Sequence, residues 1–222
     1  MSEAGVALFD IDGTLIDSTY FHALAWWRAC RKAGSTIPMA RLHRLVGMGG
    51  DKVTETLFGR VREEVSDGEA EAYKEFEGEV TRLPGARDLL IHTYESGLQV
   101  VLASSARKSQ LPAILKTLDA ADAVDTVTSA DDADETKPAP DIFAVGMERV
   151  GARADRAVAI GDTRWDVEAA EHLGIPCIGV LCGGWSQAEL LEAGAAEVFQ
   201  DPADLLRNFD GSLLGRLASS SG

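Results

Sequence analysis

Positive charge is scarce in this chain of 222 residues. Lys and Arg number 21 against 36 Asp and Glu, which gives a formal net charge of −15 at pH 7. A chain this acidic repels the phosphate backbone of nucleic acids, and no basic stripe interrupts the pattern. We therefore expect no nucleic-acid partner.

Cysteine is also scarce. Cys30, Cys177 and Cys182 are odd in number and lack a CxxC pair, which argues against a disulfide framework and against a structural zinc site. No apolar run approaches the roughly 18 residues that a membrane span requires. The opening segment MSEAGVALFD lacks the basic-then-apolar order of a signal peptide. We expect a cytoplasmic protein with no membrane partner.

Hydrophobic residues make up an ordinary 45% of the chain and are distributed in short runs. Runs that end in small or acidic residues are typical of buried parallel strands, and helical stretches lie between them. This alternation predicts an α/β fold built on a doubly wound parallel sheet. The expected strands are 6–9, 100–103, 124–128, 157–160 and 177–181, and the expected helices are 84–96, 108–118, 141–150 and 164–173.

The alternation stops between residues 17 and 81, where only helical periodicity and connecting turns are found. We predict a helical domain, residues 17–81, inserted into a core domain made of residues 1–16 and 82–222. The last residues, 217–222, end in three serines and a glycine, and we expect them to be frayed.

The strongest local signal is Asp10-Ile11-Asp12-Gly13-Thr14-Leu15, directly after an apolar strand. Two carboxylates two positions apart reach one ligand only if the strand has ended, because inside a strand they lie well separated. Gly13 permits the necessary turn. Asp10 could then act as a nucleophile and Asp12 as an acid and base. The alternative is an ordinary surface turn, in which Asp and Gly are common.

A second acidic pair, Asp162 and Asp166, follows another apolar run and opens a helix. Residues four apart project to the same side of a first helical turn. Carboxylate oxygens on one side suit Mg²⁺, and such a cation would let an acidic protein bind an anionic phosphate ester. Helix capping is the alternative, and it explains one of these aspartates without explaining why both strand ends are acidic.

Two further groups lie in positions where they could bind a phosphoryl group. Ser104 follows the strand at 100–103 and could offer its hydroxyl and nearby backbone amides, or it could only cap the next helix. Lys137 precedes a helix in the run Lys137-Pro138-Ala139-Pro140, and the prolines hold its approach extended. A solvated surface lysine is the alternative.

These four pieces, in this order and spacing, resemble the haloacid dehalogenase-like superfamily, and the helical insert resembles its mobile cap. The resemblance implies a phosphatase in which Asp10 forms an aspartyl-phosphate and Asp12 serves as acid and base. It also implies that Ser104 and Lys137 bind the phosphoryl group. Mg²⁺ would be held by Asp10, the Asp12 carbonyl and Asp162, with Asp166 as a ligand or an anchor.

The substrate site is predicted less sharply. We expect Gly13, Thr14 and Ser105 to contribute from the core. His22 resembles a histidine of beta-phosphoglucomutases and sugar-phosphate phosphatases, although a structural role is the simpler interpretation. Gly49 belongs to the glycine-rich segment 47–50, which is either a substrate-reading loop or a turn between helices.

We predict hydrolysis of a small phosphorylated metabolite, of the phosphoglycolate or sugar-phosphate type, by a monomer or homodimer. A beta-phosphoglucomutase-like phosphotransferase is the first alternative. Thr14, where the mutase pattern often has Val, and the lack of a matching basic residue near Gly50 favour hydrolysis. A haloacid dehalogenase is disfavoured, because it would need neither Asp12 nor Mg²⁺. A non-catalytic binding protein on the same scaffold is the remaining alternative.

Overall fold

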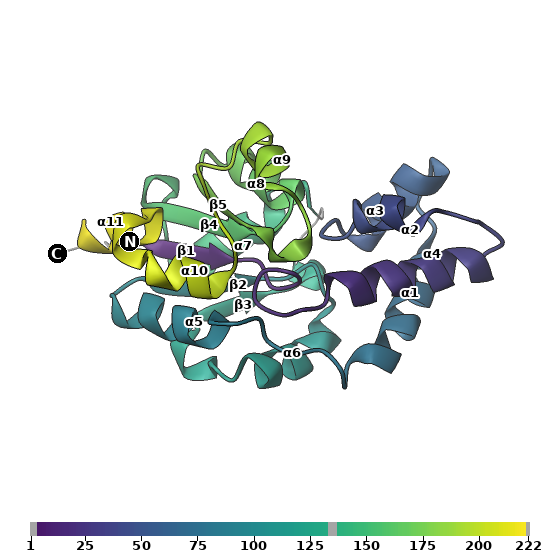
Figure 1. The fold of residues 1–222 in the computed structure, drawn as a ribbon, viewed down its shortest axis with the longest axis horizontal. Helices are drawn as coiled ribbons and strands as arrows, with labels where there is room; N and C mark the ends of the chain where they lie inside the picture. The colour runs from purple at the N-terminus through teal and green to yellow at the C-terminus, as the bar shows by residue number, and fades with distance from the viewer. Residues whose placement is uncertain (1–3, 133–136, 221–222) are drawn as a thin grey trace.

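A six-stranded parallel sheet forms the centre of the protein in the computed structural model, which describes residues 4–132 and 137–220. The strand order is β3-β2-β1-β4-β5-β6, and every neighbouring pair is parallel (Figure 1). The strands are β1 Val6–Phe9, β2 Gln99–Ala103, β3 Thr126–Thr128, β4 Ala157–Gly161, β5 Cys177–Val180 and β6 Glu197–Phe199. The predicted α/β fold is confirmed.

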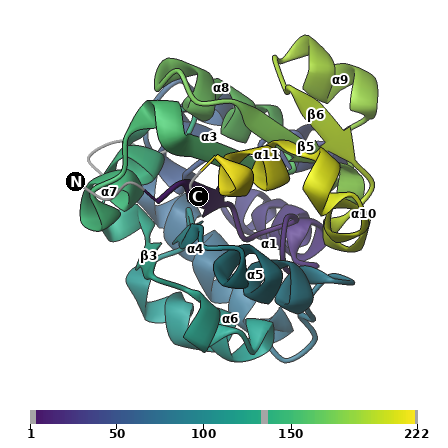
Figure 2. The same cartoon turned by 90° about the vertical axis from the view of Figure 1, so that its left-hand side faces the viewer.

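The sheet is covered on both faces because its central strands are apolar on both sides. In β1, Ala7 and Phe9 point into one buried cluster while Val6 and Leu8 point into the other. Figure 2 shows α5 and α6 on one side of the molecule and α8 and α9 on the other. The first cluster is closed by α5 Ala86–Glu95, α6 Leu111–Leu118, α10 Pro202–Arg207 and α11 Leu213–Ser219, and the second by α7 Asp141–Val150, α8 Arg164–His172 and α9 Gln187–Glu192.

The stretch between β1 and α5 contains helices and no strand, as its periodicity predicts. Its elements are α1 Thr19–Lys32, α2 Met39–His43, α3 Gly50–Phe58, α4 Glu63–Tyr73 and the 3₁₀ turn η1 Lys74–Phe76. Trp26, Leu42, Val53 and Val65 form a buried cluster of their own. In Figure 1 these helices extend beyond the carboxyl end of β1. We propose that residues 17–81 are a separate domain, called below the helical insert.

The C-terminal part of the chain is more regular than the sequence indicated. Strand β6 and helices α9, α10 and α11 were not expected, because each is at most seven residues long and carries too little periodicity to read. The expectation of frayed residues from 217 onward is wrong for 217–219, which belong to α11. That helix is anchored by the fully buried Leu214 and capped by Ser212, whose hydroxyl accepts from the Gly215 amide. Residues 221–222 lie outside the described residues.

Several other boundaries also differ from the prediction. Strand β3 begins at Thr126, two residues later than expected, because Ala121–Ala123 forms a 3₁₀ turn that delays the extended segment. The remaining 3₁₀ turns are Lys108–Gln110, Ala130–Asp132, Ala154–Arg156, Leu181–Gly183 and Phe209–Gly211. Within the described ranges, no helix has the length and apolar character to cross a membrane.

Candidate active site

Three neighbouring strands carry the candidate catalytic groups at their carboxyl ends. Asp10 directly follows β1, Ser104 follows β2 and Asp162 follows β4, and these strands are adjacent in the sheet. Ligands of such sheets bind beyond the carboxyl ends of the strands. One carboxylate oxygen each from Asp10, Asp162 and Asp166 lies within 4.8 Å of the other two, and all three residues are buried. The structure thus gathers these acidic side chains at one point.

The turn after β1 is shaped to hold two of these carboxylates. Gly13 has a φ of +83°, and a Cβ there would overlap the Asp162 side chain. The buried Thr14 hydroxyl lies 3.1 Å from Asp10 Oδ2 and 3.0 Å from Asp162 Oδ1, so it can donate to either carboxylate. Gly13 and Thr14 therefore organise the acidic cluster and do not line the adjoining cleft.

Lys137 is fully buried, which contradicts the alternative of a solvated surface lysine. Its Nζ donates to Asp10 Oδ1 at 2.5 Å and lies 2.7 Å from Asp166 Oδ1. Burial alone would lower the pKa of Lys137, but the charges of Asp10 and Asp166 outweigh burial and raise it. The lysine is therefore a fixed positive charge beside Asp10.

Asp166 serves the helix cap that the sequence offered as an alternative, and contacts the lysine as well. Its Oδ2 accepts from the Thr163 amide at 3.1 Å and from the Thr163 hydroxyl at 2.6 Å, which completes a capping box at the start of α8. Its other oxygen faces Lys137. Asp166 Oδ2 is thus hydrogen-bonded, while Oδ1 makes an ion pair with Lys137 but no hydrogen bond.

Asp162 differs, because one of its oxygens has neither a hydrogen bond nor an ion pair among the described residues. Oδ2 is buried and has no hydrogen-bond partner among the described residues. Burial, together with the negative charges of Asp10 and Asp166, raises the pKa of Asp162 well above its ordinary value. Burial also raises the pKa of Asp10, and Lys137 only partly opposes this. The cluster therefore holds more negative charge than one lysine balances.

These observations fit a bound Mg²⁺. Two carboxylates about 5 Å apart repel each other by roughly 3 kcal/mol at an effective dielectric constant near 20. A divalent cation would remove that repulsion and supply the partner that Asp162 Oδ2 lacks. Hard oxygen donors such as these carboxylates are the ligands that Mg²⁺ prefers. The donor set and the orphaned oxygen thus both fit the predicted cofactor.

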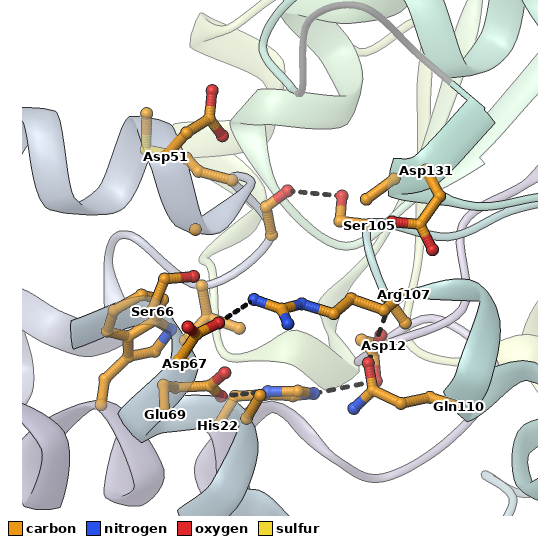
Figure 3. Close-up of a pocket in the computed structure, with 18 of the residues that line it drawn as sticks. Asp12, His22, Asp51, Ser66, Asp67, Glu69, Ser105, Arg107, Gln110 and Asp131 are labelled. Atoms are coloured by element: carbon orange, nitrogen blue, oxygen red, sulfur yellow. Dashed lines mark hydrogen bonds and ion pairs between the residues drawn. The ribbon is translucent and has the colours of Figure 1, made fainter. Parts of the chain in front are cut away.

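Asp12 is connected to the helical insert. Its Oδ1 accepts from the Ser18 hydroxyl at 2.6 Å and lies 3.2 Å from His22 Nε2. The other nitrogen, Nδ1, lies 2.9 Å from Glu69 Oε1, and the ring stacks on Tyr73 at 4.0 Å between centroids. Figure 3 shows His22 between the two carboxylates.

This contact chain sets the charges of Asp12 and His22. Burial acts to raise the pKa of Asp12, but His22 and Ser18 lower it below the ordinary value. Burial acts to lower the pKa of His22, but Asp12 and Glu69 raise it to about 10. His22 is therefore a protonated imidazole held between two carboxylates.

The serines and Gly49 are placed differently from one another. Ser104 is fully buried and its Oγ accepts from the Ala106 amide at 3.0 Å. It does not cap the next helix, because Arg107 is the N-cap of the 3₁₀ turn Lys108–Gln110 and Gln110 is the N-cap of α6. Ser105 lines the cleft, and its Oγ lies 3.4 Å from the Gly47 carbonyl oxygen. Gly49 is the N-cap of α3 and does not line the cleft, although Gly47 and Gly50 do.

A cleft of about 440 Å³ opens between the strand ends and the helical insert (Figure 3). Asp10 and Asp12 line it at the end of β1. Sequence reasoning missed the opposite wall, where α3 and α4 contribute Asp51, Glu63, Asp67 and Glu69. No local motif marks these residues, since only the packing of the insert against the core brings them there.

Gly183, in the turn after β5, packs closely against the Asp162 carboxylate. A Cβ at this position would overlap the Asp162 carboxylate. We expect Gly183→Ala to lower the melting temperature and to weaken the stabilisation by Mg²⁺, because Asp162 must move. Gly211→Ala is the matched control, since a Cβ there meets open space. Equal melting curves and Mg²⁺ responses for the two variants would contradict the close packing of Asp162.

The chain is similar to known hydrolases in sequence and in fold. A family model described as haloacid dehalogenase-like hydrolase matches residues 7–180. Phosphoglycolate phosphatase of Escherichia coli K12 is 28% identical over an alignment of 232 positions, which covers 91% of this chain and 90% of that protein. A hydrolase from Pseudomonas syringae has a TM-score of 0.87 at 33% identity, covering 93% of this chain and 98% of the other.

A candidate beta-phosphoglucomutase from Bacteroides vulgatus has a TM-score of 0.82 at 21% identity, covering 98% of this chain and 90% of the other, which shows the shared fold alone. The matched family region runs from β1 to the end of β5 and includes the whole acidic cluster. The family and its phosphatase relatives indicate an enzyme that acts on phosphoric monoesters, as the sequence predicted. On this evidence the chain belongs to the haloacid dehalogenase-like hydrolase family.

Proposed function

We propose that this chain is a Mg²⁺-dependent phosphatase that hydrolyses a small phosphorylated metabolite through a phosphoryl group carried on Asp10. One observation carries the proposal. Of the three buried carboxylates that converge at the strand ends, only Asp10 lines the cleft, and it does so with Lys137 bonded to one of its oxygens. A nucleophile needs both an open approach and nearby positive charge when its target is an anion.

The other groups take roles that follow from their contacts. Asp162, with its unpartnered oxygen, and Asp10 would hold the Mg²⁺, together with the Asp12 carbonyl oxygen. Asp166, whose oxygens are engaged by Thr163 and Lys137, would anchor the lysine. When bound, Mg²⁺ supplies positive charge to the transferring phosphoryl group.

The reaction would proceed in two halves. In the first, an Asp10 oxygen forms a bond to phosphorus, the bond from phosphorus to the ester oxygen breaks, and Asp12 gives the leaving oxygen a proton. In the second, Asp12 takes a proton from water and the water oxygen attacks phosphorus. The bond between phosphorus and the Asp10 oxygen then breaks, which restores the Asp10 carboxylate and frees inorganic phosphate. The proton that Asp12 takes from water replaces the one that it gave to the leaving oxygen. His22, protonated and 3.2 Å from Asp12, holds the Asp12 carboxyl in position.

Turnover of p-nitrophenyl phosphate tests the proposal. We expect release of p-nitrophenol with Mg²⁺, its loss with excess EDTA, and recovery when Mg²⁺ is restored. The melting curve gives an independent measure, because Mg²⁺ at a hundred times its dissociation constant should stabilise the fold by about 2.7 kcal/mol if the unfolded chain does not bind it. Turnover that persists in EDTA, or a melting temperature indifferent to Mg²⁺, would contradict the proposed site.

A further inference from the structure

We propose that the organic part of the substrate carries hydrogen-bond donors, such as hydroxyl groups, and no second negative charge. The inference rests on the proposed function for the phosphoryl end and concerns the other end of the same cleft. Asp10 and Asp12 line the cleft at the strand ends and residues of α3 and α4 line it from the insert, so a phosphoester bound at Asp10 would extend its organic group toward the helical insert. The chemistry of the insert's wall therefore decides which organic group fits.

That wall is acidic. Asp51 of α3 and Glu63, Asp67 and Glu69 of α4 line the cleft, and Figure 3 shows Asp67 and Glu69 side by side along α4. The Ser66 hydroxyl lies among them, and Trp26, Val46 and Met48 supply apolar surface. Carboxylates accept hydrogen bonds from hydroxyl or ammonium groups and repel a carboxylate or a second phosphate.

The helix N-termini of the wall are already covered by negative charge. The N-terminus of a helix is the end that attracts anions, and the first turns of α3 and α4 both border the cleft. Asp51 lies in the first turn of α3, and Glu63 lies in the first turn of α4. An anionic substrate group would meet a carboxylate at each of these ends.

The cations that line the cleft are already paired. Among the lining residues of the described chain these are His22 and Arg107. Both ring nitrogens of His22 face carboxylates, and Arg107 Nη2 donates to Asp67 Oδ1 at 2.5 Å, a contact drawn in Figure 3. A substrate carboxylate could gain a cation here only by breaking one of these pairs, which would leave a protein carboxylate unpaired.

The sequence did not distinguish between phosphoglycolate and sugar phosphates as substrates, and the acidic wall does. Phosphoglycolate carries a carboxylate next to its ester and is disfavoured. The bisphosphate that a phosphoglucomutase-like reaction requires is disfavoured for the same reason. Phosphate esters of polyols or sugars, which offer hydroxyl groups, are favoured.

Three esters of equal chain length isolate the effect of charge: 2-phosphoglycolate, 2-hydroxyethyl phosphate and O-phosphoethanolamine, which end in a carboxylate, a hydroxyl and an ammonium group. With Mg²⁺ we expect kcat/KM for hydroxyethyl phosphate to exceed that for phosphoglycolate by about tenfold or more. Like charges within about 10 Å of each other, at an effective dielectric constant near 20, repel by at least the roughly 1.4 kcal/mol that a factor of ten requires. Phosphoethanolamine should be at least as good as hydroxyethyl phosphate. Equal or reversed values for phosphoglycolate and hydroxyethyl phosphate would overturn the inference.

Variants that remove charge from the acidic wall test whether the wall causes the preference for hydroxyethyl phosphate over phosphoglycolate. The double variant Asp51→Asn/Glu63→Gln should reduce the preference for hydroxyethyl phosphate over phosphoglycolate at least threefold. Glu64→Gln is the matched control, because Glu64 is the next residue of α4, is exposed and does not line the cleft. An unchanged preference in the double variant, or an equal change in the control, would contradict the role of this wall.

Binding separates this inference from the proposed function. Failure of the proposed function would appear as absent turnover of p-nitrophenyl phosphate. Calorimetric binding of the same three esters to the Asp10→Asn variant with Mg²⁺ would still decide the inference. We expect phosphoglycolate to bind most weakly, and its binding as tightly as hydroxyethyl phosphate would contradict the proposal whether or not the enzyme turns over.

Discussion

Asp10→Asn is expected to reduce phosphatase turnover by on the order of 10⁴-fold or more, since removing the nucleophile of other covalent enzymes costs at least that much. Asn has nearly the same shape as Asp but cannot form the acyl phosphate. Initial rates with p-nitrophenyl phosphate and Mg²⁺ measure the loss. Intact-protein mass spectrometry of the acid-quenched wild type should show a phosphorylated species that the variant lacks.

The stability of this variant separates a lost nucleophile from a lost fold. Asn at position 10 removes one charge from the acidic cluster, while Lys137 keeps its contact with Asp166. We therefore expect a melting temperature in EDTA that is no lower than that of the wild type. Asp17→Asn is the matched control, since Asp17 is exposed and lies outside the cluster. Retained turnover in Asp10→Asn, or an equal loss in Asp17→Asn, would contradict the assignment of the nucleophile.

Lys137→Met should cost about 3–5 kcal/mol of folding free energy, because breaking a buried ion pair leaves charge without compensation. Lys137 has no exposed surface, and its Nζ contacts Asp10 and Asp166, so its removal leaves both without their cation. Urea unfolding at pH 8 in EDTA measures the loss. Activity should fall to background as well.

The pH dependence of this deficit has a definite sign. Burial already raises the pKa values of Asp10 and Asp162, and removing the lysine raises that of Asp10 further. When the pKa of a carboxyl is higher in the folded than in the unfolded state, the protein loses stability as the pH rises from the unfolded to the folded pKa. The deficit of Lys137→Met should therefore shrink when the pH falls from 8 to 5. Lys116→Met, which changes an exposed lysine of α6, is the control. A deficit that is equal at both pH values would contradict charge as the cause.

The core of the fold could be predicted because parallel strands buried on both faces must be apolar runs. The sequence shows β1, β2, β4 and β5 in this way. Strand β6 is a half-buried edge strand of three residues, too short to display a pattern. The C-terminal helices are also short, and they are held by tertiary contacts such as that of Leu214.

In the candidate site, too, some features could be predicted from the sequence and others depend on tertiary contacts. The motif at 10–15 and the pair Asp162 and Asp166 were predicted to converge because parallel strands end at one edge of the sheet, and they do converge. The environment of Lys137 was left open, since a lysine before a helix is usually solvated. The structure resolves it by burying this lysine against carboxylates more than 25 residues away in the chain.

By itself, the sequence determined the α/β core, the helical character of residues 17–81 and the residue types at the strand ends, because each depends on short-range periodicity or on one local turn. The acidic wall of the cleft, the pairing of Arg107 with Asp67 and the position of His22 between Asp12 and Glu69 were decided by tertiary structure alone. These contacts join residues 10 to 47 positions apart. Packing of α1 on α4 brings His22 to Glu69, and docking of the insert on the core brings His22 to Asp12 and Asp67 to Arg107.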